Sequence, residues 1–109
     1  MPIVYCYTTL DLPDASNELV EQWSSLSGIS SEEMTVNFVE LNEQVGKQYD
    51  VMAQLFLPDL WNEADINRLQ IGLAEAISEV VKVSIKGVHV ITQIVTSGTV
   101  VENGKVLTW

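Results

Sequence analysis

The fold is set by residues 49–95, which run YDVMAQLFLPDLWNEADINRLQIGLAEAISEVVKVSIKGVHVITQIV. The middle of this stretch carries apolar side chains every three or four positions: Ile66, Leu69, Leu73, Ile77 and Val80. That spacing predicts an amphipathic helix over 63–81, with Asn62 as its N-cap. The flanking segments 49–57 and 88–95 are short, apolar and rich in β-branched residues, which is typical of strands. The stretch therefore predicts one β-α-β unit.

The N-terminal part of the chain repeats this element order over residues 2–41. A β-branched and aromatic strand is expected over 3–9 and a second strand over 34–41, with a helix over 14–27 between them. Pro13 and Asp14 suit a helix start, and Gly28 suits its end. Ser30 to Glu33 has the spacing of a capping box before too short a segment for a full helix, which predicts a single helical turn.

We therefore predict one α+β domain over residues 1–109, with β-α-β units at about 2–41 and 49–95 joined by a polar loop at 42–48. Crossovers of this length make the two strands of each unit parallel, giving a four-stranded sheet with two helices on one face. Asn103-Gly104 between apolar flanks predicts a C-terminal hairpin over 99–108. Gly72, inside the long helix, is expected to allow close packing on the sheet.

The strands are apolar on both of their alternating sides, as in Met52-Ala53 followed by Leu55-Phe56-Leu57. A second apolar sheet face needs a cover, and nothing else in a chain of 109 residues can supply it. We therefore expect other subunits to cover it. The hairpin is a candidate for strand addition to the sheet edge of a neighbour.

Composition excludes several classes of function. The formal charge of −10, from 15 acids and five bases, repels phosphate backbones and anionic lipids, so neither nucleic acid nor a membrane is an expected partner. Cys6 cannot form an internal disulfide, which suits the cytoplasm, and we expect it to be a buried small hydrophobe rather than a reactive thiol. One histidine and one cysteine predict no metal site, and no glycine-rich loop suggests a nucleotide. No signal peptide or spanning segment is predicted.

Three features connect the chain to a known family: the start Met1-Pro2-Ile3-Val4, the glycine Gly28 after the first helix, and the final segment Val88 to Trp109. With the repeated β-α-β order, they resemble the tautomerase superfamily, specifically a small bacterial branch with members the size of macrophage migration inhibitory factor. The resemblance implies a homotrimer and a cofactor-free keto–enol tautomerase acting on a small 2-oxo acid or an aromatic analogue.

In that family the initiator methionine is removed and the free proline amine is the catalytic base, which here implies Pro2. Such an amine can take a proton from the carbon next to a carbonyl group and return it elsewhere if the pKa of the amine lies near neutrality. Apolar burial lowers this pKa, whereas the acidic charge of the chain raises it. If Met1 is retained, the nitrogen of Pro2 is an amide and cannot act as a base. The simpler interpretation is a proline that begins an exposed strand.

The resemblance also implies four substrate-binding positions. Ile29 stands where a lysine commonly follows the first helix, and it cannot bind a carboxylate. His89 and Ile91 fall near the family's tyrosine or asparagine on the fourth strand, although a lone strand histidine is more often structural. Arg68 lies on the second helix and could bind the substrate only across a subunit boundary. A solvated ion pair with Asp65 is the simpler interpretation of this residue.

Two functions therefore remain open. The first is a tautomerase, an isomerase that uses Pro2. The second is a non-catalytic trimeric module that kept the fold and lost the site, which the missing cation at Ile29 favours.

Overall fold

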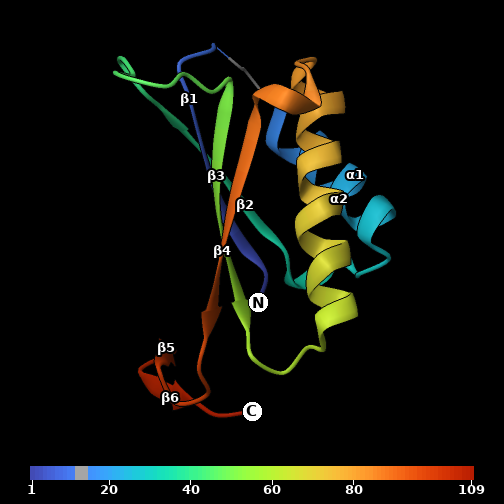
Figure 1. Cartoon of the computed structure of the whole chain (residues 1–109). Coiled ribbons are helices and arrows are strands. Elements are labelled where there is room, and N and C mark those ends of the chain that lie inside the picture. The colour runs from blue at the N-terminus through green and yellow to red at the C-terminus, as the bar shows by residue number, and fades with distance from the viewer. Residues whose placement is uncertain (12–14) are drawn as a thin grey trace.

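The computed structural model describes residues 1–11 and 15–109 and shows a mixed sheet with both helices on one side and a small hairpin beyond the end of the last long strand (Figure 1). The elements are β1 (Ile3–Thr8), α1 (Ala15–Ser27), β2 (Thr35–Glu40), β3 (Val51–Pro58), α2 (Glu63–Val81), β4 (Val88–Val95), β5 (Val100–Glu102) and β6 (Lys105–Leu107), with 3-10 turns η1 (Ser31–Glu33) and η2 (Ile85–Gly87). These elements confirm the predicted order. The helix start predicted at Pro13 and Asp14 lies outside the described residues.

The strand order in the main sheet is β2-β1-β3-β4. Strand β1 pairs in parallel with β2, and β3 pairs in parallel with β4, as the two β-α-β units require. The units join through an antiparallel pairing of β1 with β3, in which Ile3 faces Phe56 and Tyr7 faces Met52. Strand β1 is therefore an inner strand with partners on both sides.

The two helices bury one face of the sheet. Alternate residues of β1 and β3 point toward them and are buried, whereas the residues between are half-buried or exposed. The buried apolar core consists of Val4, Cys6, Leu19, Trp23, Met34, Val51, Ala53, Leu55, Leu57, Leu69, Leu73, Ala76, Ile77 and Val81. Removing this apolar surface from water is the main favourable term for the fold.

Local capping explains where the helical segments begin. The side chain of Asn62 accepts a hydrogen bond from the backbone N–H of Asp65 at 2.8 Å, as expected of an N-cap. Ser30 accepts in the same way from Glu32 at 3.3 Å, so the segment after it forms the single predicted turn. Helix α2 ends at Lys82, which takes a left-handed conformation with φ 64°.

Gly72 serves helix–helix packing and not the contact with the sheet that we predicted. A Cβ atom at this position would lie 3.3 Å from the backbone nitrogen of Ser27 and 3.5 Å from the carbonyl carbon of Leu26, both in the last turn of α1. The two helices also share a buried hydrogen bond, from the indole nitrogen of Trp23 to the carbonyl oxygen of Leu69 at 2.9 Å. Gly72 therefore lets α1 and α2 approach closely above the sheet.

No element of residues 1–11 and 15–109 covers the sheet face that points away from the helices (Figure 1). We call it the open face. It carries the following side chains of β1, β3 and β4, by register and alternation: Ile3, Tyr5, Tyr7, Met52, Gln54, Phe56, His89, Ile91, Gln93 and Val95. The predicted second apolar face is thus present, and Ile91 remains 54% exposed.

The C-terminal hairpin forms its own two-stranded sheet, β5-β6, and is not part of the main sheet. Asn103 and Gly104 connect its strands with φ 54° and 73°, the left-handed values that a two-residue turn of this kind needs. The hairpin exposes Val101 and Val106. An isolated two-stranded hairpin is marginal in water, so this one needs contacts beyond its own two strands.

No helix in residues 1–11 and 15–109 is both long enough and apolar enough to cross a membrane. Within the same residues, no three side chains of histidine, cysteine, aspartate or glutamate gather closely enough to hold a metal ion.

The buried thiol of Cys6 predicts a loss of stability at alkaline pH. Burial raises the pKa of Cys6 from its ordinary 9.0 to about 12, so above pH 9 the thiol ionises in the unfolded chain before it does so in the folded one. Stability is then present in full below pH 9 and falls as pH rises toward 12, by about 2 kcal/mol at pH 10.5.

Urea unfolding of the wild type and of Cys6→Val at pH 8 and at pH 10.5 measures this loss. Tyrosine ionisation affects both proteins alike, so the wild type should lose about 2 kcal/mol more than the variant. Equal losses in the two proteins would contradict the burial of the thiol.

Candidate functional site

Among the described residues, the open face carries a hollow toward each end of its strands. The first, which we call the N-terminal hollow, has a volume of about 260 Å³ and is lined by Met1, Ile3, Tyr5, Phe56, Val95 and Val100. Its walls come from β1, β3, the end of β4 and the first residue of the hairpin. The rings of Tyr5 and Phe56 meet edge to face across β1 and β3, with centroids 6.0 Å apart. The hollow is thus an open apolar site with an aromatic wall.

Pro2 lies directly behind this hollow and is fully buried. It precedes β1 by one residue, and its carbonyl oxygen accepts a hydrogen bond from Thr35 at 2.9 Å. Because side chains alternate along a strand, the ring of Pro2 lies on the helix side with Val4, whereas its neighbours Met1 and Ile3 line the open-face hollow. A buried proline on an inner strand does not fit the simpler interpretation of a proline that begins an exposed strand.

The electrostatic surroundings of the N-terminal hollow are acidic. The terminal ammonium of Met1 lies 3.9 Å from Oε2 of Glu33, in the turn η1. The side chain of Glu33 is 80% exposed, so water screens most of this attraction. The hollow therefore combines an apolar lining with a negative charge at its rim.

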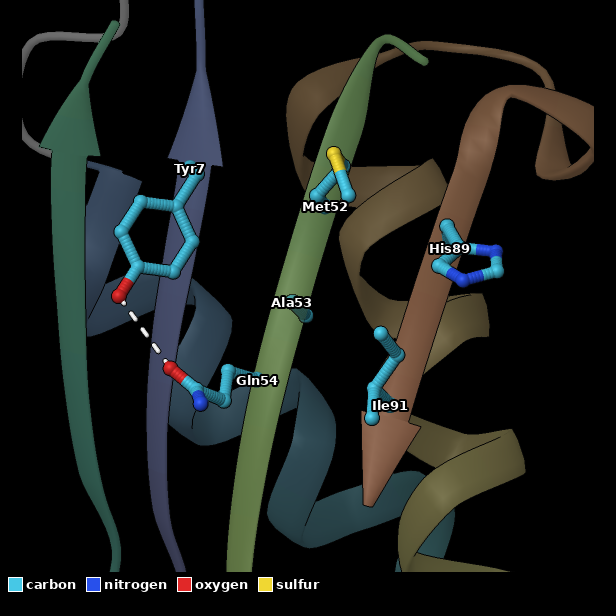
Figure 2. Close-up of a pocket in the computed structure, with 6 residues that line it drawn as sticks. All are labelled: Tyr7, Met52, Ala53, Gln54, His89 and Ile91. Carbon is cyan, nitrogen blue, oxygen red and sulfur yellow. Dashed lines mark hydrogen bonds between the residues drawn. The ribbon is translucent and has the colours of Figure 1, made fainter. Parts of the chain in front are cut away.

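The second hollow, the His89 hollow, has a volume of about 210 Å³ and is lined by Tyr7, Met52, Ala53, Gln54, His89 and Ile91 (Figure 2). Figure 2 shows these side chains side by side on three neighbouring strands, with His89 and Ile91 both on β4. The hydroxyl of Tyr7 donates a hydrogen bond to Oε1 of Gln54 at 3.3 Å. This hollow therefore has polar groups that the N-terminal hollow lacks.

His89 is held from one side by aromatic stacking. The ring of Tyr49 lies 4.6 Å from the imidazole, tilted by 35°, and the ammonium of Lys47 lies 5.5 Å from the centre of the Tyr49 ring. Lys47, Tyr49 and His89 thus form a short stack beside the hollow. Such packing is also what a structural histidine would show, so the stack alone assigns no role to His89.

Within one chain the structure separates Pro2 from His89 and Ile91. The register pairs Tyr7 with Met52 and Met52 with His89, so His89 is level with Tyr7. Tyr7 lies five positions beyond Pro2, or roughly 16 Å at about 3.3 Å per residue. His89 and Pro2 can therefore contribute to one site only if they come from different copies of the chain. Ile91 is level with Tyr5 and so lies closer to Pro2, but it lines the His89 hollow and not the N-terminal one.

The other two predicted positions lie on the helix side. Ile29 follows Gly28 in the loop after α1 and packs against the core, and its carbonyl oxygen accepts a hydrogen bond from the hydroxyl of Ser24 at 2.6 Å. Arg68 lies on α2 with its side chain 58% exposed and pairs with Asp65, as the simpler interpretation expected. Neither lines a hollow of the open face.

Sequence reasoning missed Tyr5, Phe56, Val95 and Val100 as lining residues, as well as Tyr7 and Gln54. Alternation along each predicted strand could have placed these residues on a common side. The antiparallel pairing of β1 with β3, which brings them together, has no local signal in the sequence.

Comparison with solved structures identifies the fold. A wild-type fused 4-OT described as an asymmetric trimer has a TM-score of 0.80 at 18% identity, over 95% of this chain and 94% of that one. Pt0534, described as inactivated by 2-oxo-3-pentynoate, has a TM-score of 0.75 at 17% sequence identity. The match covers 96% of this chain and 94% of Pt0534. Macrophage migration inhibitory factor of Toxoplasma gondii has a TM-score of 0.65 at 10% sequence identity. The match covers 95% of this chain and 96% of that protein.

These similarities show that the chain has the fold of the tautomerase superfamily, as its resemblance to that family predicted. At this level of identity they show the fold alone. The sequence matches no protein-family model and no curated protein.

Proposed function

We propose that this chain is a cofactor-free, trimeric keto–enol tautomerase in which Pro2, freed by removal of Met1, is the general base. One observation carries the proposal: Met1 lines the apolar N-terminal hollow, and Pro2 is buried immediately behind it. The nitrogen of Pro2 is bonded to the carbonyl carbon of Met1. Removing Met1 would leave that nitrogen as a secondary amine at the wall of the hollow.

The surroundings of such an amine favour its neutral form. An α-amino group has an ordinary pKa of about 7.7–8, and an apolar environment lowers the pKa because it disfavours the charged ammonium. Glu33 acts in the opposite direction, but its carboxylate is exposed and screened by water. The proposal requires the apolar lining to outweigh this screened attraction, which leaves part of the amine in its neutral form.

The neutral amine has the lone pair that the reaction needs. It takes a proton from the carbon next to a carbonyl group, the electrons of the broken C–H bond form a C=C bond, and the carbonyl oxygen becomes an enolate or enol oxygen. The resulting ammonium returns the proton to carbon or to oxygen. The substrate is a small carbonyl compound, either a 2-oxo acid or an aromatic analogue.

The other predicted positions act, in this proposal, only through an assembly. His89 lies too far from Pro2 in the same chain, and Ile91 lines the other hollow, so their contribution to a substrate site at Pro2 requires a second copy. The exposed guanidinium of Arg68 is subject to the same condition. A trimer is supported by the open apolar face and by the description of a fused 4-OT as a trimer.

The alternative, a non-catalytic trimeric module with this fold, is favoured by Ile29. Its apolar side chain packs against the core where the family has a lysine. In either case the single buried thiol of Cys6 fits the reducing cytoplasm, and the charge of −10 disfavours nucleic acid and anionic membranes as partners.

Placing a charge on the open face tests the assembly. Ile91→Asp is expected to shift the oligomer toward monomer in light scattering or analytical ultracentrifugation, because an interface core tolerates an unpaired carboxylate poorly. Ile71→Asp is the matched control, since Ile71 is 57% exposed on α2 and Ile91 is 54% exposed on β4. Equal masses for both variants and the wild type would count against the open face as the interface.

Replacing the proline tests the base directly. With phenylpyruvate as substrate, Pro2→Ala should lower the rate of enolisation by roughly 10²–10⁴, the usual contribution of a positioned general base. Pro58→Ala is the matched control, because Pro58 is also a buried proline of the same sheet and has no proposed role. The proposal fails if the wild type enolises neither phenylpyruvate nor the uncharged ketone phenylacetone faster than buffer does, or if Pro2→Ala and wild type have the same rate on both compounds.

A further inference from the structure

The N-terminal hollow differs from a carboxylate site in its chemistry. The five lining residues that remain once Met1 is removed are aliphatic or aromatic, and the hydroxyl of Tyr5 is the only hydrogen-bonding side-chain group among them. The edge-to-face pair of Tyr5 and Phe56 forms one wall. A flat ring can pack against such a wall, whereas a carboxylate would find the single hydroxyl of Tyr5 as its only side-chain hydrogen-bond donor and no cation.

The charges around the hollow also disfavour an anion. The carboxylate of Glu33 lies at the rim of the hollow, 3.9 Å from the backbone nitrogen of Met1. Among the described cations, Lys47 lies beside Tyr49 at the far end of the sheet, and Arg68 pairs with Asp65 on α2.

The remaining lysines are also poorly placed to bind an anion in the hollow. Lys82 caps α2 and Lys86 lies in η2, at the end of the sheet where β4 begins. Lys105 lies opposite Glu102 in the hairpin and does not line the hollow. Within one chain, none of the described lysines and arginines lines the hollow, and the formal charge of the whole chain is −10.

We infer that the substrate of this site is a neutral aryl carbonyl compound and not a 2-oxo carboxylate. The inference rests on the proposed function and narrows its substrate class. The aryl ring packs against Tyr5 and Phe56, and the carbon between ring and carbonyl faces the amine of Pro2. The hydroxyl of Tyr5 is the lining group able to donate a hydrogen bond to the carbonyl oxygen.

The step is a proton transfer without any external oxidant or reductant. The Pro2 amine removes a proton from the carbon between the ring and the carbonyl, and the C–H electrons form the C=C bond of the enolate. In D₂O the ammonium exchanges with solvent and returns a deuteron, so the product is the same ketone with deuterium at that carbon. The exchange is visible by proton NMR.

Phenylacetone and phenylpyruvate form a matched pair of probes, since both carry a benzyl group on a carbonyl and only the second is an anion. Their intrinsic acidities differ, so the informative quantity for each compound is the exchange rate with wild type divided by the rate with Pro2→Ala. We expect this ratio to be at least tenfold larger for phenylacetone. Raising the salt concentration should increase kcat/KM for phenylpyruvate and leave that for phenylacetone unchanged, because salt screens the repulsion.

A cation placed in the wall should reverse the preference. Val95→Lys puts an ammonium group at the N-terminal hollow, and we expect it to raise kcat/KM for phenylpyruvate relative to phenylacetone about tenfold, as hydrogen bonds to charged groups allow. Ile94→Lys is the matched control, because Ile94 is the preceding residue of β4 and points to the other side of the sheet. It should leave the preference unchanged.

The outcomes separate the two proposals. If neither compound exchanges faster with wild type than with Pro2→Ala, the proposed function itself fails. If the ratio for phenylpyruvate equals or exceeds that for phenylacetone, the amine of Pro2 is active and the inference about substrate class is overturned, which would mean that another subunit supplies a cation. An unchanged preference in Val95→Lys would also overturn it.

Discussion

Strand β1 pairs with β2 on one side and with β3 on the other. The position of Pro2 and the make-up of the open face both depend on its antiparallel register with β3. This pairing joins two β-α-β units that would otherwise be separate two-stranded pieces. It also puts Pro2 at the start of an inner strand and brings Phe56 opposite Ile3. A slip of one residue would exchange the buried and open sides of β1, so the register is determined by burial of Val4 and Cys6 under the helices.

The two helices cover one face of the sheet and leave the other face bare, and this asymmetry connects stability with function. The helix side contains the buried apolar core, whereas the open face contains both hollows and several exposed apolar side chains. Apolar surface of that kind is normally buried against a partner. The same face is therefore expected to provide the subunit contacts and the substrate site, which explains why residues separated along one chain can still belong to one site.

The helices, strands and hairpin could be predicted from the sequence, but the way in which they pack and pair could not. The apolar stripe of α2 and the Asn103-Gly104 turn are local signals, and the structure confirms both. The pairing of β1 with β3 depends on contacts between distant residues, so the grouping of Tyr5 with Phe56 had no local signal. Gly72 shows the same limit: its close approach was predictable, but its partner, the last turn of α1, was not.

The state of the Pro2 nitrogen decides the central claim, and nitrogen-15 NMR of the natively expressed, proline-labelled protein measures it most directly. The account predicts a secondary-amine resonance for Pro2 that titrates with a pKa below about 8, because the amine is free and lies against an apolar wall. Three tertiary-amide resonances that do not change with pH, one for each proline of the chain, with no secondary-amine resonance, would show that Met1 is still attached. That result would contradict the account, because an acylated nitrogen has no basic lone pair with which to take a proton from a substrate.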